Sequence, residues 1–266
     1  YPPEVLAAND ASIRQVAIPS EHGGWSLTLE PAILGLIVAP SLAGVALAAA
    51  ALLGFLLRTP LKLVFVDRRR GRSLRRTELA TWAAAGYLVL LTTALAIAAA
   101  LGEPLFWQPL IIALPLFAIE FGYDIRSKSR RLIPELVGTV GIGAVVAAIV
   151  LADGGRPSLA YGLWIVIAAR AVAAIPFVRL QLRRSKNQPA SVPRSDAAQG
   201  LAVLVAAVGV AVADAPIAAV FAIAGLAGFH VAASRLAVPK VAVIGAQQVV
   251  LGLTVVLITG LAAVAP

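Results

Sequence analysis

The 266-residue chain contains no cysteine and no methionine, and only two histidines. The absence of cysteine excludes disulfides, thiolate catalysis and the attachment of metals or haem through thiolates. Acidic residues are also scarce, 13 against 22 lysines and arginines, so the formal net charge is +9. Apolar residues make up 60% of the chain and the mean hydropathy is +0.92, whereas a soluble domain is about 45–50% apolar. Most of the chain is therefore expected to lie in lipid.

Apolar runs of roughly 17 to 25 residues, the length that crosses about 30 Å of hydrocarbon, follow one another along the sequence. They predict an all-α membrane protein with a polar amino-terminal segment, residues 1–19, and a single polytopic domain, residues 20–266. We expect nine transmembrane helices, at about 22–39, 42–57, 78–101, 105–123, 132–151, 158–178, 198–213, 216–233 and 241–264.

The apolar block 25–57 admits a second interpretation, one tilted helix, which would reduce the number of spans to eight. Its residues Glu30, Pro31 and Pro40 favour two helices joined by a tight turn. A single long helix would place two prolines and a carboxylate in lipid without local relief.

Basic residues are concentrated in every second connection. Nineteen of the 22 lysines and arginines lie in the segments 58–76, 126–131, 179–194 and 235–240. The connections between them, near 102–104, 153–156 and 214–216, are short and carry only Arg156. The positive-inside rule places the four basic segments and the amino terminus in the cytoplasm. We therefore expect a multi-pass protein of the bacterial cytoplasmic (inner) membrane, with anionic lipids or an anionic substrate as partners rather than nucleic acid.

A glycine-rich segment, Pro19-Ser20-Glu21-His22-Gly23-Gly24-Trp25, precedes the first expected helix, and Glu30 follows inside the span. One interpretation is a helix start with an aromatic residue at the membrane surface. The other is a functional site, because an ionisable group inside a span usually faces a polar cavity. We take Glu21, His22 and Trp25 as candidate ligand-binding residues, and His22 and Glu30 as candidate catalytic residues.

A second group of candidates lies at the end of the second expected helix. Arg58 and Lys62 are four residues apart, so on a continued helix they share one face and could grip a phosphate or carboxylate together. Asp67 follows, as a third candidate catalytic residue, before a run of arginines that is typical of solvated positive charge. Arg58 and Lys62 are candidate ligand-binding residues.

Carboxylates cluster where the fourth expected helix ends and the fifth begins. Glu120 and Asp124 are four residues apart, and Glu135 lies about one turn inside the fifth span, where an arginine is its simplest partner. Tyr123, Asp124 and Glu135 are added to the candidate ligand-binding residues.

Arg170 stands in the middle of the sixth expected helix, about two turns before Arg179. This position is too deep for positive-inside charge, which leaves a snorkelling side chain or a group that faces a polar cavity. We favour the second interpretation and add Arg170 and Arg179 to the ligand-binding candidates. Arg170 and Glu30 are expected to line a polar hollow open to the cell interior. His230 is expected to be a packed or interfacial residue, and at least one of Gln247 and Gln248 to form a hydrogen bond between helices.

The stretch Glu21-His22-Gly23-Gly24-Trp25, followed by Glu30-Pro31, resembles the hallmark of the YwiC-like family of bacterial integral membrane proteins. The region from Arg58-Thr59-Pro60-Leu61-Lys62 to Asp67-Arg68-Arg69-Arg70 also fits that family, and the similarity runs from about residue 17 to the end. The resemblance implies an integral membrane protein and no particular activity.

More remotely, the organisation resembles the UbiA-type intramembrane prenyltransferases, which implies a bundle of that kind with its active face in the cytoplasm. The matching features are the step from Pro31 to Gly35, Tyr123 with Lys128 and Arg130, and the segment 134–138. Those enzymes hold magnesium and a prenyl diphosphate with two aspartate-rich motifs. Here the first motif keeps only Asp67, and the second, around 179–186, has no aspartate. Magnesium is therefore not expected, and no other cofactor is indicated.

These observations predict a membrane protein whose cytoplasm-facing polar cavity binds an amphipathic anion, such as an isoprenoid or lipid phosphate or a quinone-like molecule. Arginine can hold such an anion without a metal. An enzyme and a non-enzymatic binding protein both stay open. The alternatives are an active prenyltransferase, an accessory subunit of a respiratory or photosynthetic membrane complex, and a proton-coupled transporter.

Overall fold

The structure, a computed structural model, describes residues 12–18, 22–72, 74–126 and 131–265, and these form helices without any β-strand. Glu21 lies outside the described residues, as do Lys128, Arg130 and the side chain of His22. The helices are α2 (Ile13–Ala17), α3 (His22–Val38), α4 (Leu42–Arg69), α5 (Arg75–Leu101), η1 (Pro104–Phe106), α6 (Trp107–Ile125), α7 (Leu132–Ala152), α8 (Pro157–Arg184), α9 (Val192–Ala213), α10 (Ile217–Ala233) and α11 (Val241–Val264).

Each predicted helix has a counterpart among α3 to α11. In the described part of the chain, seven helical stretches are long and apolar enough to cross a membrane, namely α4, α5, η1 with α6, α7, α8, α9 and α11. Two apolar helices, Gly24–Val38 and Ile217–Ala233, are shorter. The chain is thus a helical protein with several potential membrane spans.

The block 25–57 is divided at Pro40, as predicted. α3 ends at Val38, and α4 begins at Leu42 after Ser41, whose extended backbone and side-chain hydroxyl cap the new helix by accepting the amide of Gly44 at 3.1 Å. Side-chain capping of this kind satisfies an amide that has no partner within the helix.

Three helices extend well beyond the predicted spans at the basic end, and one of them is α9, which begins at Val192 rather than 198. α4 continues to Arg69 rather than 57, and α8 continues to Arg184 rather than 178. The apolar run marks where a helix leaves lipid, but arginine, lysine and leucine are good helix formers, so the helix extends beyond that point.

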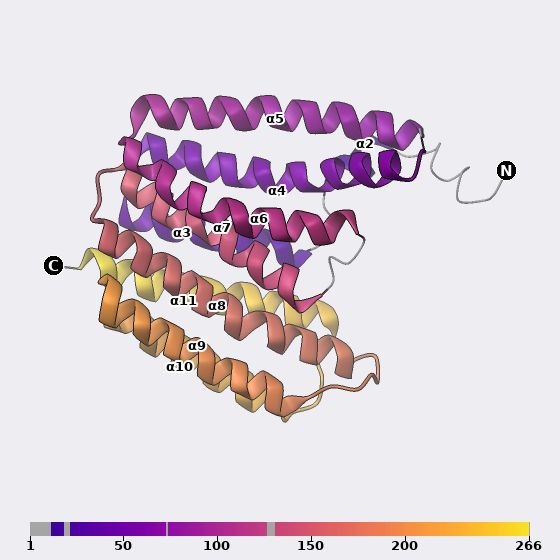
Figure 1. The fold of residues 1–266 in the computed structure, drawn as a ribbon. Helices are drawn as coiled ribbons and strands as arrows, with labels where there is room; N and C mark the ends of the chain where they lie inside the picture. Colours follow the sequence, from indigo (N-terminus) through magenta and orange to yellow (C-terminus); the bar gives the residue numbers. More distant parts are fainter. Residues whose placement is uncertain (1–11, 19–21, 73, 127–130, 266) are drawn as a thin grey trace.

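The helices lie side by side, with α5 at one edge of the bundle and α9 with α10 at the other (Figure 1). α7 and α8 occupy the centre, because 67% of the apolar window of each is buried, against 17–28% for the other potential spans. Small residues allow this packing. Gly35 of α3 and Gly44 of α4 both meet Ile149 of α7, which is completely buried.

The helices alternate in direction. Figure 1 shows the connections α4–α5, α6–α7, α8–α9 and α10–α11 at one end of the bundle, and the carboxyl terminus at the opposite end. We call the end with the four connections the basic end, because these connections belong to the segments that hold most of the lysines and arginines. α4 and α5 project beyond the other helices at the basic end (Figure 1).

Candidate functional site

Two pairs of charged residues meet near the basic end and form what we call the α4–α6 cluster: Arg58 and Lys62 on α4, Glu120 and Asp124 on α6. Arg58 donates to Asp124 through Nε at 2.8 Å and Nη2 at 3.2 Å, and its Nη1 lies 2.9 Å from Glu120 Oε1. Lys62 Nζ lies 3.8 Å from Asp124 Oδ1. Each pair has the four-residue spacing that puts both side chains on one helix face.

Burial differs sharply within this cluster. The Asp124 side chain is 1% exposed, whereas those of Arg58 and Lys62 are 33% and 32% exposed. Glu120 lies against Gly138 of α7, where a Cβ atom would overlap its carboxyl group. A glycine on α7 therefore makes room for the carboxylate that holds Arg58. The cations converge on a buried anion while remaining partly accessible.

A neighbouring ion pair connects the two central helices. Arg179 of α8 donates to Glu135 of α7 at 2.8 Å. The prediction that an arginine is the partner of Glu135 is therefore confirmed. Tyr123 is half-buried on α6 beside Asp124, and Trp25 of α3 packs edge to face against Phe55 of α4 with ring centroids 5.2 Å apart. Trp25 thus contributes to helix packing.

Glu30 and Arg170 form an ion pair inside the bundle. Nη2 of Arg170 lies 3.2 Å from Oε1 of Glu30, and Ser26 donates to the same oxygen at 2.6 Å. The side chains of Arg170 and Glu30 are 1% and 2% exposed. The expectation that they line an open polar hollow is wrong, because the two groups converge on each other and are enclosed by the packed helices.

Hydrogen bonds extend from this ion pair across three further helices, through what we call the buried chain: Glu30, Arg170, Gln248, His230 and Gln199. Arg170 donates to the Gln248 carbonyl at 2.8 Å and to its Oε1 at 3.4 Å, and Gln248 Nε2 lies 3.0 Å from His230 Nε2. His230 Nδ1 lies 3.1 Å from Gln199 Oε1, and Gln199 Nε2 donates to Ala173 O at 2.9 Å.

The buried chain fixes the tautomer of His230. Gln248 accepts from Arg170 through Oε1, so its amide nitrogen donates to His230 Nε2. Gln199 donates through Nε2, so its oxygen accepts from His230 Nδ1, which must carry the proton. The ring also stacks on Phe177, with centroids 4.0 Å apart. The buried chain therefore joins α3, α8, α9, α10 and α11. Among the described residues, the buried Nε of Arg170 has no hydrogen-bond partner.

The prediction that Gln247 or Gln248 bonds between helices is confirmed for Gln248. We expect Gln248→Leu to destabilise the protein by about 1–3 kcal/mol, because Arg170 and His230 each lose a buried partner. The matched control is Gln247→Leu, the same change at the preceding residue, which is only partly buried. Its free energy of unfolding should be within about 0.5 kcal/mol of that of wild type. Free energies of unfolding from detergent denaturation test this. Equal effects of the two changes would contradict the role of the buried chain.

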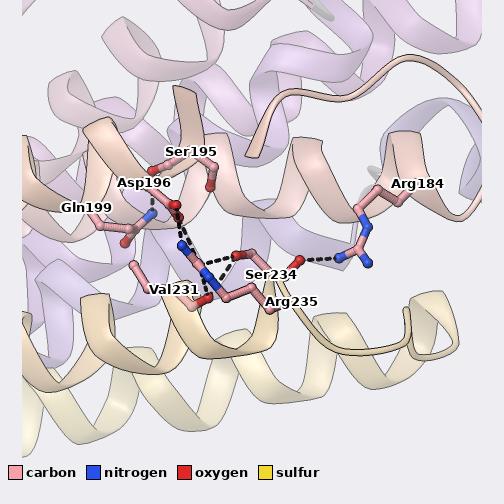
Figure 2. Close-up of polar contacts among 7 residues, drawn as sticks. All are labelled: Arg184, Ser195, Asp196, Gln199, Val231, Ser234 and Arg235. Atoms are coloured by element: carbon pink, nitrogen blue, oxygen red, sulfur yellow. Dashed lines mark hydrogen bonds and ion pairs between the residues drawn. The ribbon is translucent and has the colours of Figure 1, made fainter. Parts of the chain in front are cut away.

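Polar contacts continue from Gln199 to the surface at the basic end (Figure 2). Gln199 donates to the carbonyl of Ser195, and the adjacent Asp196 binds Arg235 at 2.8 Å. Arg184 of α8 donates to the carbonyls of Ser234 at 2.7 Å and Leu236 at 2.9 Å. Arg184 and Arg235 therefore tie the end of α10 to α8 and α9. Sequence reasoning missed this role, because both residues look like solvated loop charges.

Asp67 lies away from the other candidates, at the turn between α4 and α5. Its carboxylate accepts from Arg76 at 3.0 Å and 2.7 Å and from Thr77 at 2.8 Å. These bonds already engage both carboxylate oxygens. Within the described residues, no group of three or more histidine, aspartate or glutamate side chains could hold a metal ion.

The structure thus brings together Arg58, Lys62 and Asp124, pairs Glu135 with Arg179, and pairs Glu30 with Arg170. Two hollows in the described residues lie elsewhere. One is an apolar groove between α10 and α11, and the other lies beside the start of α5.

A family model described as "YwiC-like protein" matches residues 18–150. The match contains α3 to α6 and nearly all of α7, and therefore Glu30 and the whole α4–α6 cluster. No curated protein and no solved structure matches the chain.

Proposed function

The chain belongs to the YwiC-like family, and from that premise we propose that it binds the anionic head group of an amphipathic molecule at the α4–α6 cluster. The ligand class is an isoprenoid or lipid phosphate, or a quinone-like molecule whose polar end accepts hydrogen bonds. Arg170 is a positioning residue in this proposal rather than a ligand contact, since Glu30 and Gln248 engage it inside the bundle.

One observation carries the proposal: two cations one helical turn apart converge on a buried carboxylate and remain about one-third exposed. Asp124 holds Arg58 through two hydrogen bonds and lies 3.8 Å from Lys62 Nζ, so part of the conformational entropy of these side chains is lost before a head group binds. Guanidinium and ammonium groups fixed in this way suit a phosphate or carboxylate without a metal.

The charge around the cluster also favours an anion. Arg126 and Arg131, both exposed, flank the α6–α7 connection, and Arg179 lies on the neighbouring helix. With Arg58 and Lys62 this makes five cations against the three carboxylates of Glu120, Asp124 and Glu135. The excess positive charge should attract an anionic head group to this end of the bundle.

Magnesium-dependent prenyl transfer is not part of the proposal. Asp67 is the one residue left of the first aspartate-rich motif, and its oxygens are occupied by Arg76 and Thr77. A metal would have to displace a bidentate arginine. Turnover of a prenyl diphosphate that requires magnesium and is lost in Asp67→Asn would instead identify a transferase.

We further propose that the protein crosses the bacterial cytoplasmic membrane nine times in a UbiA-like bundle with the basic end in the cytoplasm. α3 and α10 are the short spans in this arrangement, of 17 residues each. About 17 residues is the lower limit for a transmembrane helix. The concentration of arginine and lysine at one end supports the orientation.

Lys62→Gln is expected to lower the amount of amphipathic ligand retained by the purified protein roughly tenfold, because one charge-assisted contact is lost. Asp124 stays paired with Arg58 in this variant, so the fold should be preserved. Mass spectrometry of organic extracts, normalised to protein, measures retention of isoprenoid phosphates, phospholipids and quinones.

The matched control is Arg194→Gln, which removes one exposed cation from the same end of the bundle. Arg58→Lys provides a second comparison, since it keeps the charge but removes the two-pronged contact with Asp124. Retention that is unchanged in both Lys62→Gln and Arg58→Lys would refute the proposed site.

A further inference from the structure

The turn between α4 and α5 carries a cluster of exposed arginines that the proposed ligand site does not use. We call residues 68–72 and 74–78 the α4–α5 tip. It projects past the other helices at the basic end (Figure 1). The exposed cations of the tip are Arg68, Arg69, Arg70, Arg72 and Arg75.

The backbone of the tip has a defined shape. The amides of Arg70, Gly71 and Arg72 bond to the last carbonyls of α4, and Gly71 adopts the positive φ of 64° that glycine tolerates best. Asp67 clamps the start of α5 through Arg76 and Thr77. Arg76 therefore ties the start of α5 to the end of α4, and the five other arginines are exposed around hydrogen-bonded backbone.

Trp82 indicates where the membrane surface crosses α5. Its side chain is 70% exposed, as expected of an aromatic residue at the interface. From Trp82 to the end of α5 at Leu101 the helix rises about 30 Å, which matches the hydrocarbon thickness. The backbone of Arg75 stands about 10 Å beyond Trp82 on the water side, so its long side chain can reach back toward the lipid phosphates.

A shallow, open hollow lies between these two levels on the surface of α5, lined by Leu74, Arg75, Glu78, Leu79 and Trp82. The four α5 residues recur at spacings of three and four, so they share one helix face. Leu79 and Trp82 form its apolar part near the hydrocarbon, and Arg75 its cationic part near water. We propose that this hollow and the adjoining arginines bind the head group of an anionic phospholipid.

The arrangement fits a lipid better than an acidic protein. A phospholipid presents a phosphate above an apolar chain, in the same order as Arg75 above Leu79 and Trp82. An acidic polypeptide would bind through the arginines alone, and the apolar part of the hollow would have no role. Glu78 is the one carboxylate of the tip, against the five exposed arginines and Arg76, so the net charge selects anionic over zwitterionic head groups.

The test uses the full-length protein, purified in neutral detergent and titrated with phosphatidylglycerol or phosphatidylcholine, with bound lipid counted by native mass spectrometry. The wild-type protein should bind phosphatidylglycerol more tightly than phosphatidylcholine. Replacing the five exposed arginines of the tip by glutamine should weaken that binding by roughly fivefold for each arginine in contact. Trp82→Ala should weaken it without any change in charge.

The control variant removes four exposed cations from the same end of the bundle that belong neither to the tip nor to the α4–α6 cluster, by changing Arg183, Lys186, Arg194 and Lys240 to glutamine. It should keep the preference for phosphatidylglycerol. Equal losses of binding per charge removed in the tip and control variants would reveal a general charge effect and overturn the site. Unaltered binding by the tip variant would overturn it too, as would glycerophosphate or poly-glutamate that competes fully with the lipid. Thermal unfolding without added lipid confirms that each variant is folded.

Discussion

Arg170→Leu is expected to destabilise the protein by about 3–5 kcal/mol, because it leaves the carboxylate of Glu30 buried without its cation. Glu30→Leu should cost a similar amount, since the guanidinium of Arg170 is then the uncompensated charge. Both side chains are almost completely inaccessible, so water cannot replace the missing partner. The free energy of unfolding, measured by denaturation in mixed micelles, tests both changes.

The double variant Glu30→Leu/Arg170→Leu tests whether the cost of each single change comes from the unpaired charge that it leaves buried. Replacing a buried pair by apolar residues of similar size is often neutral, so the double variant should be more stable than either single variant. Additive losses would contradict this account. The same variant tests the role of Arg170, because it should still retain the amphipathic ligand if Arg170 only positions its neighbours. Loss of ligand from a stable double variant would make Arg170 a ligand contact.

The positions and order of the apolar helices could be predicted from the sequence because lipid imposes a length on apolar runs. Pro40 and Ser41 divided the first run, and the capping bond from Gly44 to Ser41 explains why. The inner ends of α4 and α8 could not be predicted in the same way. Hydropathy does not predict how far a charged helix continues in water. α4 continues for about two turns beyond Lys62.

The partners of the candidate residues were harder to predict than the residues themselves. Glu30 and Arg170 stood out because a charge inside a span is costly and needs compensation, but they are 140 positions apart in the sequence. The two pairs of the α4–α6 cluster were each visible as a four-residue spacing. That their faces meet depends on how α4, α6 and α7 pack.

Ser26, which donates to Glu30, and two residues of the buried chain gave no signal that sequence reasoning could use. Ser26 and Gln199 are uncharged, and His230 is near the end of its helix, where a polar residue is unremarkable. Their importance comes from matching donors and acceptors across five helices. A histidine and two glutamines in separate apolar segments could have suggested interhelical bonding, but not the order of the contacts.

Gly252→Ala is expected to cost about 3 kcal/mol or more, because α11 packs directly against the buried ion pair at this glycine. A Cβ atom here would overlap Oε1 of Glu30 and lie 2.8 Å from Nη2 of Arg170. A glutamate side chain without fixed partners could rotate away from an added methyl group. Glu30 is held by Ser26 and Arg170, so movement would break bonds that have no replacement inside the bundle.

Gly245→Ala is the matched control on the same helix. A Cβ atom at Gly245 would meet nothing within 4 Å, so alanine should be neutral or should stabilise the protein by up to about 1 kcal/mol through its helix propensity. The measured difference between the two variants therefore reports the contact with the ion pair and not the loss of glycine. If Gly252→Ala unfolds at the same denaturant concentration as Gly245→Ala, then α11 does not depend on this close approach. Combining Gly252→Ala with Glu30→Leu/Arg170→Leu is a further test. Most of the loss of stability caused by Gly252→Ala should disappear once both charged groups are absent.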